Sequence, residues 1–276
     1  MTYHEFWRPL TAVYDEGEAR AVAQLMLEMR FGLTMADVLC GRMPSDEEEL
    51  RRIQQRLLAG EPVQYVLGEA EFGGRRFRVS SSVLIPRPET YELCHFALPA
   101  DAADWQGRVL DIGTGSGCIA CTLAAELPQA EVTAWDVSEE ALAVARENAE
   151  NIGVKVSFEQ VNVFGLTPSA YDEKWDIIVS NPPYICEQEK ATMERNVLEH
   201  EPHTALFVPD DDPLLFYRTI SDYAIETLNP DGELYFEINP LYHHDLVQLL
   251  HSYDFTLVIS QLDQFGKARF IKATQQ

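Results

Sequence analysis

The chain has 276 residues, of which 46% are hydrophobic and 24% are charged, a composition typical of globular proteins and not of disordered or fibrous ones. Its 21 basic and 45 acidic residues give a net charge of −24, which excludes an overall attraction to nucleic acid and favours a basic protein or a small molecule as partner. Five cysteines without framework spacing predict reduced thiols and a cytoplasmic location, and we expect neither a signal peptide nor a membrane span.

The N-terminal part of the chain is predicted to be a small helical domain. We place its boundary so that residues 1–75 form this domain and residues 76–276 form a second, larger one. No catalytic set is visible in the helices, so packing and substrate recognition both stay open as their role. The expected helices are Glu18–Arg30, Thr34–Leu39, and one that a capping box at Ser45–Glu48 opens and that Gly60 and Pro62 end.

A change of pattern after the helices predicts a β-hairpin that connects the two domains. Gln64–Leu67 and Phe77–Leu84 are expected to be extended. The pair Gly73-Gly74 lies between them and supplies the turn.

A proline-containing segment, Ile85–Thr90, follows the hairpin. Its two prolines stiffen the backbone, and an acidic residue just after the second proline suits the first turn of a helix. The side chains of Arg87 and Glu89 therefore belong either to a structural loop or to a loop that lines a ligand site.

A strand, a glycine turn and a helix follow one another within Val109–Leu127, as at the start of a nucleotide-binding α/β domain. The glycines within Gly113–Gly117 allow the backbone to pass close to a ligand. The next strand ends at Asp136, which is placed to accept hydrogen bonds from ribose hydroxyls. NAD enzymes use a similar turn, but Cys118 occupies the third glycine position of their fingerprint, so S-adenosylmethionine is the better match.

A third strand is expected near Val156–Val161, followed by Phe164, which either stacks on an adenine or packs in the core. The long charged stretch Glu187–Asp212 has no strong periodicity and is expected to be a lid or a disordered loop. Further helices and strands should complete the sheet, at Leu214–Leu228, Leu234–Ile238, Leu241–Tyr253, Thr256–Ile259 and Arg269–Lys272.

The most informative stretch is the apolar strand Ile177–Ser180, which runs into Asn181, Pro182, Pro183 and Tyr184. The prolines cannot continue a sheet, so Asn181 lies at the carboxyl end of a strand, where open α/β folds bind ligands. The Asn181 side-chain oxygen and the Pro182 carbonyl can both accept hydrogen bonds from one planar NH2 group, and Tyr184 can lie against its flat face. The motif by itself predicts either a site for an amide or an exocyclic amine, or a strand that the prolines end with Asn181 as a turn residue. The glycine turn upstream favours the first interpretation.

Taken together, the motifs resemble the bacterial release factor glutamine methyltransferases, over nearly the whole chain. The order and spacing of the motifs are more specific than Asn-Pro-Pro-Tyr alone, which amino-methylating DNA enzymes share. The segments that carry the resemblance are Pro62–Gly68, Leu84–Thr90, Asp111–Gly117, Ser180–Ile185 and Glu201–Leu206.

The resemblance implies an α/β fold, a seven-stranded class I methyltransferase domain joined by a hairpin to the small helical domain. It implies S-adenosylmethionine as cofactor and, as substrate, the glutamine of the Gly-Gly-Gln loop in peptide chain release factors. The cofactor contacts carried over are Gly113, Thr114, Gly115, Ser116, Gly117, Asp136, Phe164 and Asn181. The catalytic and substrate contacts carried over are Asn181, Pro182, Pro183 and Tyr184, with Arg87 and Glu89 from the proline-containing loop.

Three other functions stay open at this point: methylation of a glutamine in a large-subunit ribosomal protein, methylation of adenine in DNA, and non-catalytic binding of S-adenosylmethionine. The charge of −24 weighs against DNA. The seven histidines form no set with metal-ligand spacing, so we expect no metal. We also expect a monomer that does not bind membranes.

Overall fold

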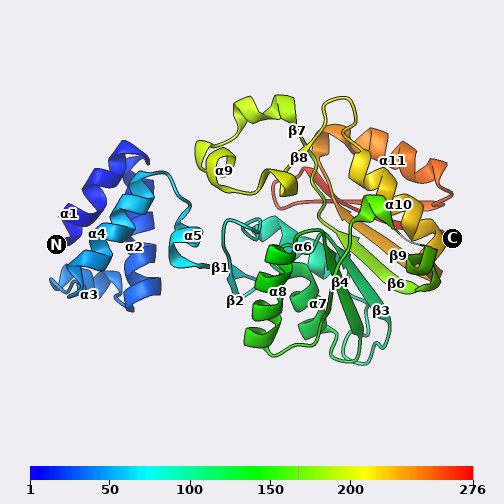
Figure 1. The fold of residues 1–276 in the computed structure, drawn as a ribbon, viewed down its shortest axis with the longest axis horizontal. Helices are drawn as coiled ribbons and strands as arrows, with labels where there is room; N and C mark the ends of the chain where they lie inside the picture. The colour runs from blue at the N-terminus through cyan, green and yellow to red at the C-terminus, as the bar shows by residue number, and fades with distance from the viewer. Residues whose placement is uncertain (167, 276) are drawn as a thin grey trace. The chain divides into compact units, whose positions relative to one another are not determined.

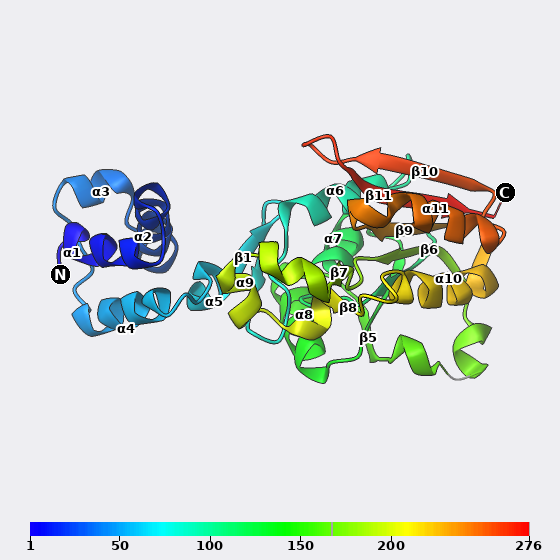
Figure 2. The same ribbon diagram turned by 90° about the horizontal axis from the view of Figure 1, so that it is seen from above.

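The computed structural model describes residues 1–166 and 168–275. Its secondary structure is drawn in Figures 1 and 2. The chain forms two compact units, Met1–Ala70 with Met193–His200 and Glu71–Thr192 with Glu201–Gln276.

The first unit is a set of short helices around its own apolar core. Its helices are α1 (Tyr3–Trp7), η1 (Arg8–Ala12), α2 (Glu16–Phe31), α3 (Met35–Leu39), α4 (Glu47–Leu58), α5 (Val63–Leu67) and α9 (Arg195–His200). Helix α4 turns Leu50, Ile53 and Leu57 into that core, as their spacing predicts. Gly32 has a positive φ of 65° and caps the C-terminus of α2.

Two local predictions for this unit are wrong. The N-cap of α4 is Asp46, whose side chain accepts a hydrogen bond from the Glu49 N–H at 2.9 Å, and not Ser45. The stretch Gln64–Leu67 is not extended but belongs to helix α5, with Gly68 in the left-handed conformation as its C-cap. Burial of Tyr65 and Val66 against neighbouring side chains outweighs their intrinsic preference for strands.

The second unit is built on a seven-stranded sheet, which confirms the predicted fold class. The strands are β3 (Arg108–Ile112), β4 (Glu131–Asp136), β5 (Ser157–Gln160), β6 (Trp175–Ser180), β9 (Leu228–Glu237), β10 (Leu257–Leu262) and β11 (Ala268–Thr274). Their spatial order is β10-β11-β9-β6-β3-β4-β5, with the strands from β9 to β5 parallel and the β11 and β10 pairings antiparallel. The chain moves outward from β3 to β5 and then returns to β6 on the other side of β3. This reversal creates a switch point at the carboxyl ends of β3 and β6, where such sheets bind ligands.

Helices cover both faces of the sheet, giving three layers (Figures 1 and 2). They are α6 (Pro88–Phe96), α7 (Cys118–Glu126) and α8 (Glu139–Ile152) on one face, and α10 (Leu215–Thr227) and α11 (His243–Ser252) on the other. Neighbouring residues of a central strand enter opposite cores: Val109 packs with the α7 side and Leu110 with the α10 side. The central strands are apolar on both faces for this reason.

The glycine pair predicted as a hairpin turn does join two strands, β1 (Glu69–Phe72) and β2 (Arg75–Arg78). Gly73 is required there, because it has a positive φ of 57° and a Cβ would lie 2.2 Å from the Tyr91 ring of α6. The predicted extension to Leu84 is wrong, since the strand ends at Arg78 and the Val83 N–H closes a turn onto the Ser80 carbonyl.

The stretch expected to be a lid or a disordered loop contains regular structure. A short parallel pair, β7 (Ile185–Cys186) and β8 (Phe207–Val208), brackets it. Between these strands lie η4 (Glu187–Thr192), α9 and η5 (His203–Ala205). The prediction missed these elements because each is only two to six residues long, too short to give a detectable hydrophobic periodicity.

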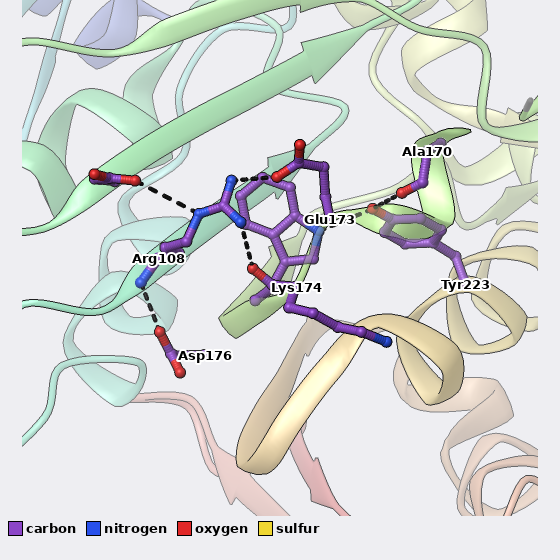
Figure 3. Close-up of polar contacts among 8 residues, drawn as sticks. Arg108, Ala170, Glu173, Lys174, Asp176 and Tyr223 are labelled. Atoms are coloured by element: carbon purple, nitrogen blue, oxygen red, sulfur yellow. Dashed lines mark hydrogen bonds and ion pairs between the residues drawn. The ribbon is translucent and has the colours of Figure 1, made fainter. Parts of the chain in front are cut away.

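Polar contacts around Arg108 fix the amino end of β3 against its neighbours (Figure 3). The Arg108 N–H donates to the Asp176 carboxylate at 2.7 Å, and its guanidinium lies 4.6 Å from the centre of the Trp175 ring. The guanidinium also donates to the Glu173 carboxylate and to the Lys174 carbonyl. These contacts hold β3 and β6 in register at the edge opposite the switch point, so both strands end at fixed positions where the ligand site is expected.

Candidate active site

A cavity of about 470 Å³ opens at the carboxyl ends of β3, β4 and β6, within the range of about 300–1,000 Å³ usual for small-molecule sites. The three motifs singled out in the sequence meet in its wall. Of the predicted site residues, Arg87, Gly113, Thr114, Gly115, Ser116, Asp136, Phe164, Asn181, Pro182 and Pro183 line it. Glu89, Gly117 and Tyr184 are also among the described residues and lie outside the lining.

Backbone hydrogen bonds to β4 hold the glycine turn between β3 and α7, and the side on which its Cβ atoms would lie is open. The N–H groups of Gly113 and Thr114 both donate to the Trp135 carbonyl at 2.9 Å. Gly113 and Gly115 have φ angles of 77° and 55°, and a Cβ on either would meet no atom within 4 Å. The turn therefore combines a backbone that only glycine adopts easily with space for a ligand to approach it.

Gly117 serves a different purpose from the two glycines before it. It has a φ of 79° at the N-cap of α7, and a Cβ there would lie 3.0 Å from the Cβ of Ala145 on α8. Its small size lets the two helices pack closely. This explains why the structure puts Gly117 behind the cavity wall rather than in it.

Asp136, at the end of β4, ties the glycine turn to the next helix. One carboxylate oxygen accepts the Gly115 N–H at 2.8 Å and the other accepts the Ser138 N–H at 2.9 Å. Ser138 in turn caps α8. A carboxylate has about four acceptor positions, so Asp136 keeps capacity for hydroxyl groups of a ligand in the cavity that it lines.

The Asn-Pro-Pro-Tyr corner begins where β6 ends. The Ser180 hydroxyl donates to the Ile112 carbonyl at 2.6 Å, which joins the corner to the strand that precedes the glycine turn. Asn181 and the two prolines then line the cavity. Tyr184 points away toward β9, where its hydroxyl donates to the Glu237 carboxylate at 3.0 Å.

The proline-containing loop is anchored through a buried acid that the prediction did not assign a role. The Arg87 guanidinium lies 2.5 Å from the Glu201 carboxylate, whose side chain is 1% exposed. The Ile85 N–H donates to the other Glu201 oxygen at 3.2 Å. Arg87 is thus held at the cavity wall, while Glu89 lies outside the lining.

The aromatic wall of the cavity comes from Phe164 and Phe216. Phe164 is 49% exposed, and its ring centroid lies 4.9 Å from that of Phe216 on α10. A half-exposed ring of this kind is available to a planar ligand group. Phe164 lies within η2 (Val163–Gly165), which has no buried residue, so its ring is not packed in the core.

Sequence reasoning missed three buried polar residues beside the site. Thr90 and Glu237 are 3% and 2% exposed and hydrogen bond to each other at 2.7 Å. Asp111 is fully buried beneath the glycine turn, where it accepts hydrogen bonds from the Thr114 hydroxyl and the Ala120 N–H. Burial raises the pKa of Asp111 to about 7, although those two hydrogen bonds act to lower it. The sequence did contain a signal for Asp111, because an acidic residue within the apolar run of β3 indicates a buried carboxyl group.

Two kinds of site are not found in the part of the chain that the structure describes. No group of three or more His, Cys, Asp or Glu side chains there is arranged to hold a metal ion. None of the helices described combines the length and the apolar character that crossing a membrane requires.

Comparison with known proteins gives a consistent result. The family model Methyltransferase small domain matches residues 95–204, and the family model PrmC N-terminal domain matches residues 9–68. The crystal structure of a methyltransferase from Pyrococcus furiosus is similar with a TM-score of 0.54 and 18% identity, covering 81% of this chain and 98% of that one. The T. thermophilus 16S rRNA N2 G1207 methyltransferase, solved in complex with AdoMet and guanosine, has a TM-score of 0.51 and 18% identity over 75% of this chain and 50% of that one. These two structures support the fold alone.

The sequence relatives are much closer. The release factor glutamine methyltransferase of Bacteroides thetaiotaomicron is 45% identical over 273 residues, covering 96% of this chain and 96% of that protein. That of Flavobacterium psychrophilum is 42% identical over 275 residues, covering 97% and 96%. The chain therefore belongs to the release factor glutamine methyltransferase family.

Proposed function

We propose that the protein transfers a methyl group from S-adenosylmethionine to the side-chain nitrogen of a glutamine in peptide chain release factors, the glutamine of their Gly-Gly-Gln loop. One observation carries the proposal. The Asn-Pro-Pro corner, suited to an NH2 group, and the glycine turn with Asp136, suited to a nucleoside cofactor, line one cavity.

The residues of the cavity fit S-adenosylmethionine. The open space above Gly113 and Gly115 admits the methionine part, with Thr114, Ser116 and Gly117 completing the turn. Asp136 has acceptor capacity for the ribose hydroxyls, and the exposed face of Phe164 suits the adenine. When bound, this cofactor supplies a methyl group carried on a positively charged sulfur.

The chain's own part in the reaction is to bind and orient the glutamine amide. The nitrogen of an amide is a poor nucleophile because its lone pair is delocalised into the carbonyl. The Asn181 Oδ1 and the Pro182 carbonyl accept its two N–H groups and so fix the nitrogen with its lone pair facing the methyl group. Orientation of this kind supplies roughly 7–11 kcal/mol in favourable cases.

The chemistry requires little further help from side chains. Exclusion of water by the prolines strengthens both hydrogen bonds. Methylation makes the amide nitrogen far more acidic, so its proton leaves without a strong base. This account needs neither a metal ion nor a general base from the protein.

Pro183 and Arg87, which line the cavity, are proposed to contact the substrate around the reacting amide. Tyr184 and Glu89 lie outside that lining, and no contact with the amide is proposed for them. Arg87 is the better supported of the two proposed contacts, because its ion pair with Glu201 holds it at the cavity wall. We propose that the helical residues 1–75 assist recognition of the release factor. We also propose that the enzyme works as a cytoplasmic monomer and binds neither DNA nor membranes.

The test is transfer of label from methyl-labelled S-adenosylmethionine to four acceptors. These are a release factor, the same factor with Gln→Ala in its Gly-Gly-Gln loop, large-subunit ribosomal proteins, and DNA. We expect label in the first alone. Label in the ribosomal proteins or the DNA would replace the proposed substrate, and cofactor binding without any transfer would indicate a non-catalytic module.

A further inference from the structure

A line of buried hydrogen bonds runs from the core of the second unit to Asn181. Glu237, at the end of β9, is 2% exposed, and Thr90, on α6, is 3% exposed. The Thr90 hydroxyl donates to one Glu237 oxygen at 2.7 Å, and the Tyr184 hydroxyl donates to the other at 3.0 Å. The Asn181 side-chain nitrogen donates to the Thr90 oxygen at 3.2 Å. Three segments far apart in sequence thus meet behind the Asn-Pro-Pro corner.

The direction of these hydrogen bonds depends on the protonation of Glu237, and the ionised form gives the arrangement described next. An ionised carboxylate can only accept, so the single hydroxyl hydrogen of Thr90 must point to it. The Thr90 oxygen then offers Asn181 only lone pairs. The Asn181 amide must therefore turn its NH2 group to Thr90, which leaves its oxygen facing the other way.

This direction matters for the proposed function, on which the inference rests. The glutamine amide presents N–H groups, so an acceptor must face it. If the Asn181 amide were reversed, two NH2 groups would oppose each other and the glutamine would lose one of its two hydrogen bonds.

We propose that Thr90 and Glu237 are positioning residues, which hold the Asn181 amide with its oxygen directed at the substrate nitrogen. Glu237 acts through Thr90, and Thr90, which also lines the cavity, acts through Asn181.

The protonation of Glu237 offers an independent readout. Burial raises the pKa of Glu237, while its bonds to Thr90 and Tyr184 and the nearby Arg269 of β11 act to lower it, and Glu89 of α6 acts to raise it. Tyr217 of α10 also faces this residue, with its hydroxyl on the Glu237 carbonyl at 3.1 Å. A protonated Glu237 can donate to Thr90 and free the Thr90 hydrogen for Asn181. Turnover should therefore fall toward acidic pH as Glu237 takes up its proton.

The decisive pair of variants is Thr90→Val and Thr90→Ser. Valine keeps the shape of threonine and removes the hydroxyl, whereas serine keeps the hydroxyl. For Thr90→Val we expect kcat to fall roughly 10- to 100-fold, the effect of one misplaced hydrogen bond at the reacting group. The KM for the release factor and the Kd for S-adenosylmethionine should stay within about twofold, and Thr90→Ser should restore most of kcat.

A matched control is Thr122→Val. Thr122 is 1% exposed on α7, and its hydroxyl has no partner among the described residues. It should lose no activity. Glu237→Gln, which imitates the protonated acid, should lower kcat at all pH values and abolish the acidic limb of the pH profile. Melting temperatures of all variants separate these effects from unfolding.

Equal kcat for wild type and Thr90→Val would overturn the proposal, as would a Thr90→Ser variant no better than Thr90→Val. So would a loss of kcat matched by an equal loss in cofactor affinity, because that indicates general damage to the site. The proposed function fails separately, if the wild-type protein transfers no methyl group to the release factor at all.

Discussion

Replacement of Asp136 by alanine should abolish tight cofactor binding. The Asp136 carboxylate accepts the N–H groups of Gly115 and Ser138 and lines the cavity. Two further acceptor positions are available for the ribose hydroxyls. A hydrogen bond to a charged group contributes about 1.5–3 kcal/mol, so loss of two such bonds should raise the Kd for S-adenosylmethionine by at least roughly 100-fold.

Titration calorimetry of the purified variant against the cofactor measures this change directly. Asp136→Asn is the matched control, because it keeps the shape and one acceptor oxygen and should give an intermediate Kd. Loss of the Gly115 bond alone would loosen the glycine turn, so a melting temperature is needed for each variant. An unchanged Kd for a folded Asp136→Ala protein would remove Asp136 from the cofactor site.

Two further predictions concern stability. The pKa of Asp111 is raised to about 7 from 3.8, so the folded state holds this proton more tightly than the unfolded state; the resulting stabilisation is complete below the unfolded pKa and is lost as pH rises through about 7. Between pH 5 and pH 8 about two pKa units of this difference are lost, so denaturation at these two pH values should show a decline of up to about 3 kcal/mol in the wild type but not in Asp111→Asn. Parallel declines in both would disprove it. Arg87→Met should lower the free energy of unfolding by about 1–3 kcal/mol, because it leaves Glu201 buried and unpaired. This is less than the loss of a fully buried ion pair would cause, since solvent screens Arg87, which is 35% exposed. Adding Glu201→Gln should recover part of that loss, and purely additive effects in this double-mutant cycle would argue against the pairing.

Local sequence patterns predicted most of the fold. The strands β3, β4 and β6 and the helix α7 after β3 were predicted because buried parallel strands are apolar runs and a glycine turn precedes that helix. Where packing competed with local preference, as at Tyr65 and Val66 in α5, the prediction failed. The short elements between Glu187 and Asp212 were also beyond reach, since one or two turns leave no periodicity to detect.

The candidate site divides in the same way. The glycine turn, Asp136 and the Asn-Pro-Pro corner are short contiguous motifs, and their convergence follows from the rule that parallel strands end at one edge. The contacts of Thr90 with Glu237 and of Arg87 with Glu201 join residues 147 and 114 positions apart. No local pattern encodes such pairs, so only the folded chain reveals them.

The central claim is that Asn181 accepts a hydrogen bond from the glutamine amide and orients it, and that binding the cofactor is not its main role. The most direct measurement is single-turnover methyl transfer to a release factor by Asn181→Ala, combined with calorimetry for S-adenosylmethionine on the same sample. The account predicts that transfer is abolished while cofactor affinity falls only modestly, the reverse of the separation expected for Asp136→Ala. Near-normal transfer by Asn181→Ala would contradict it.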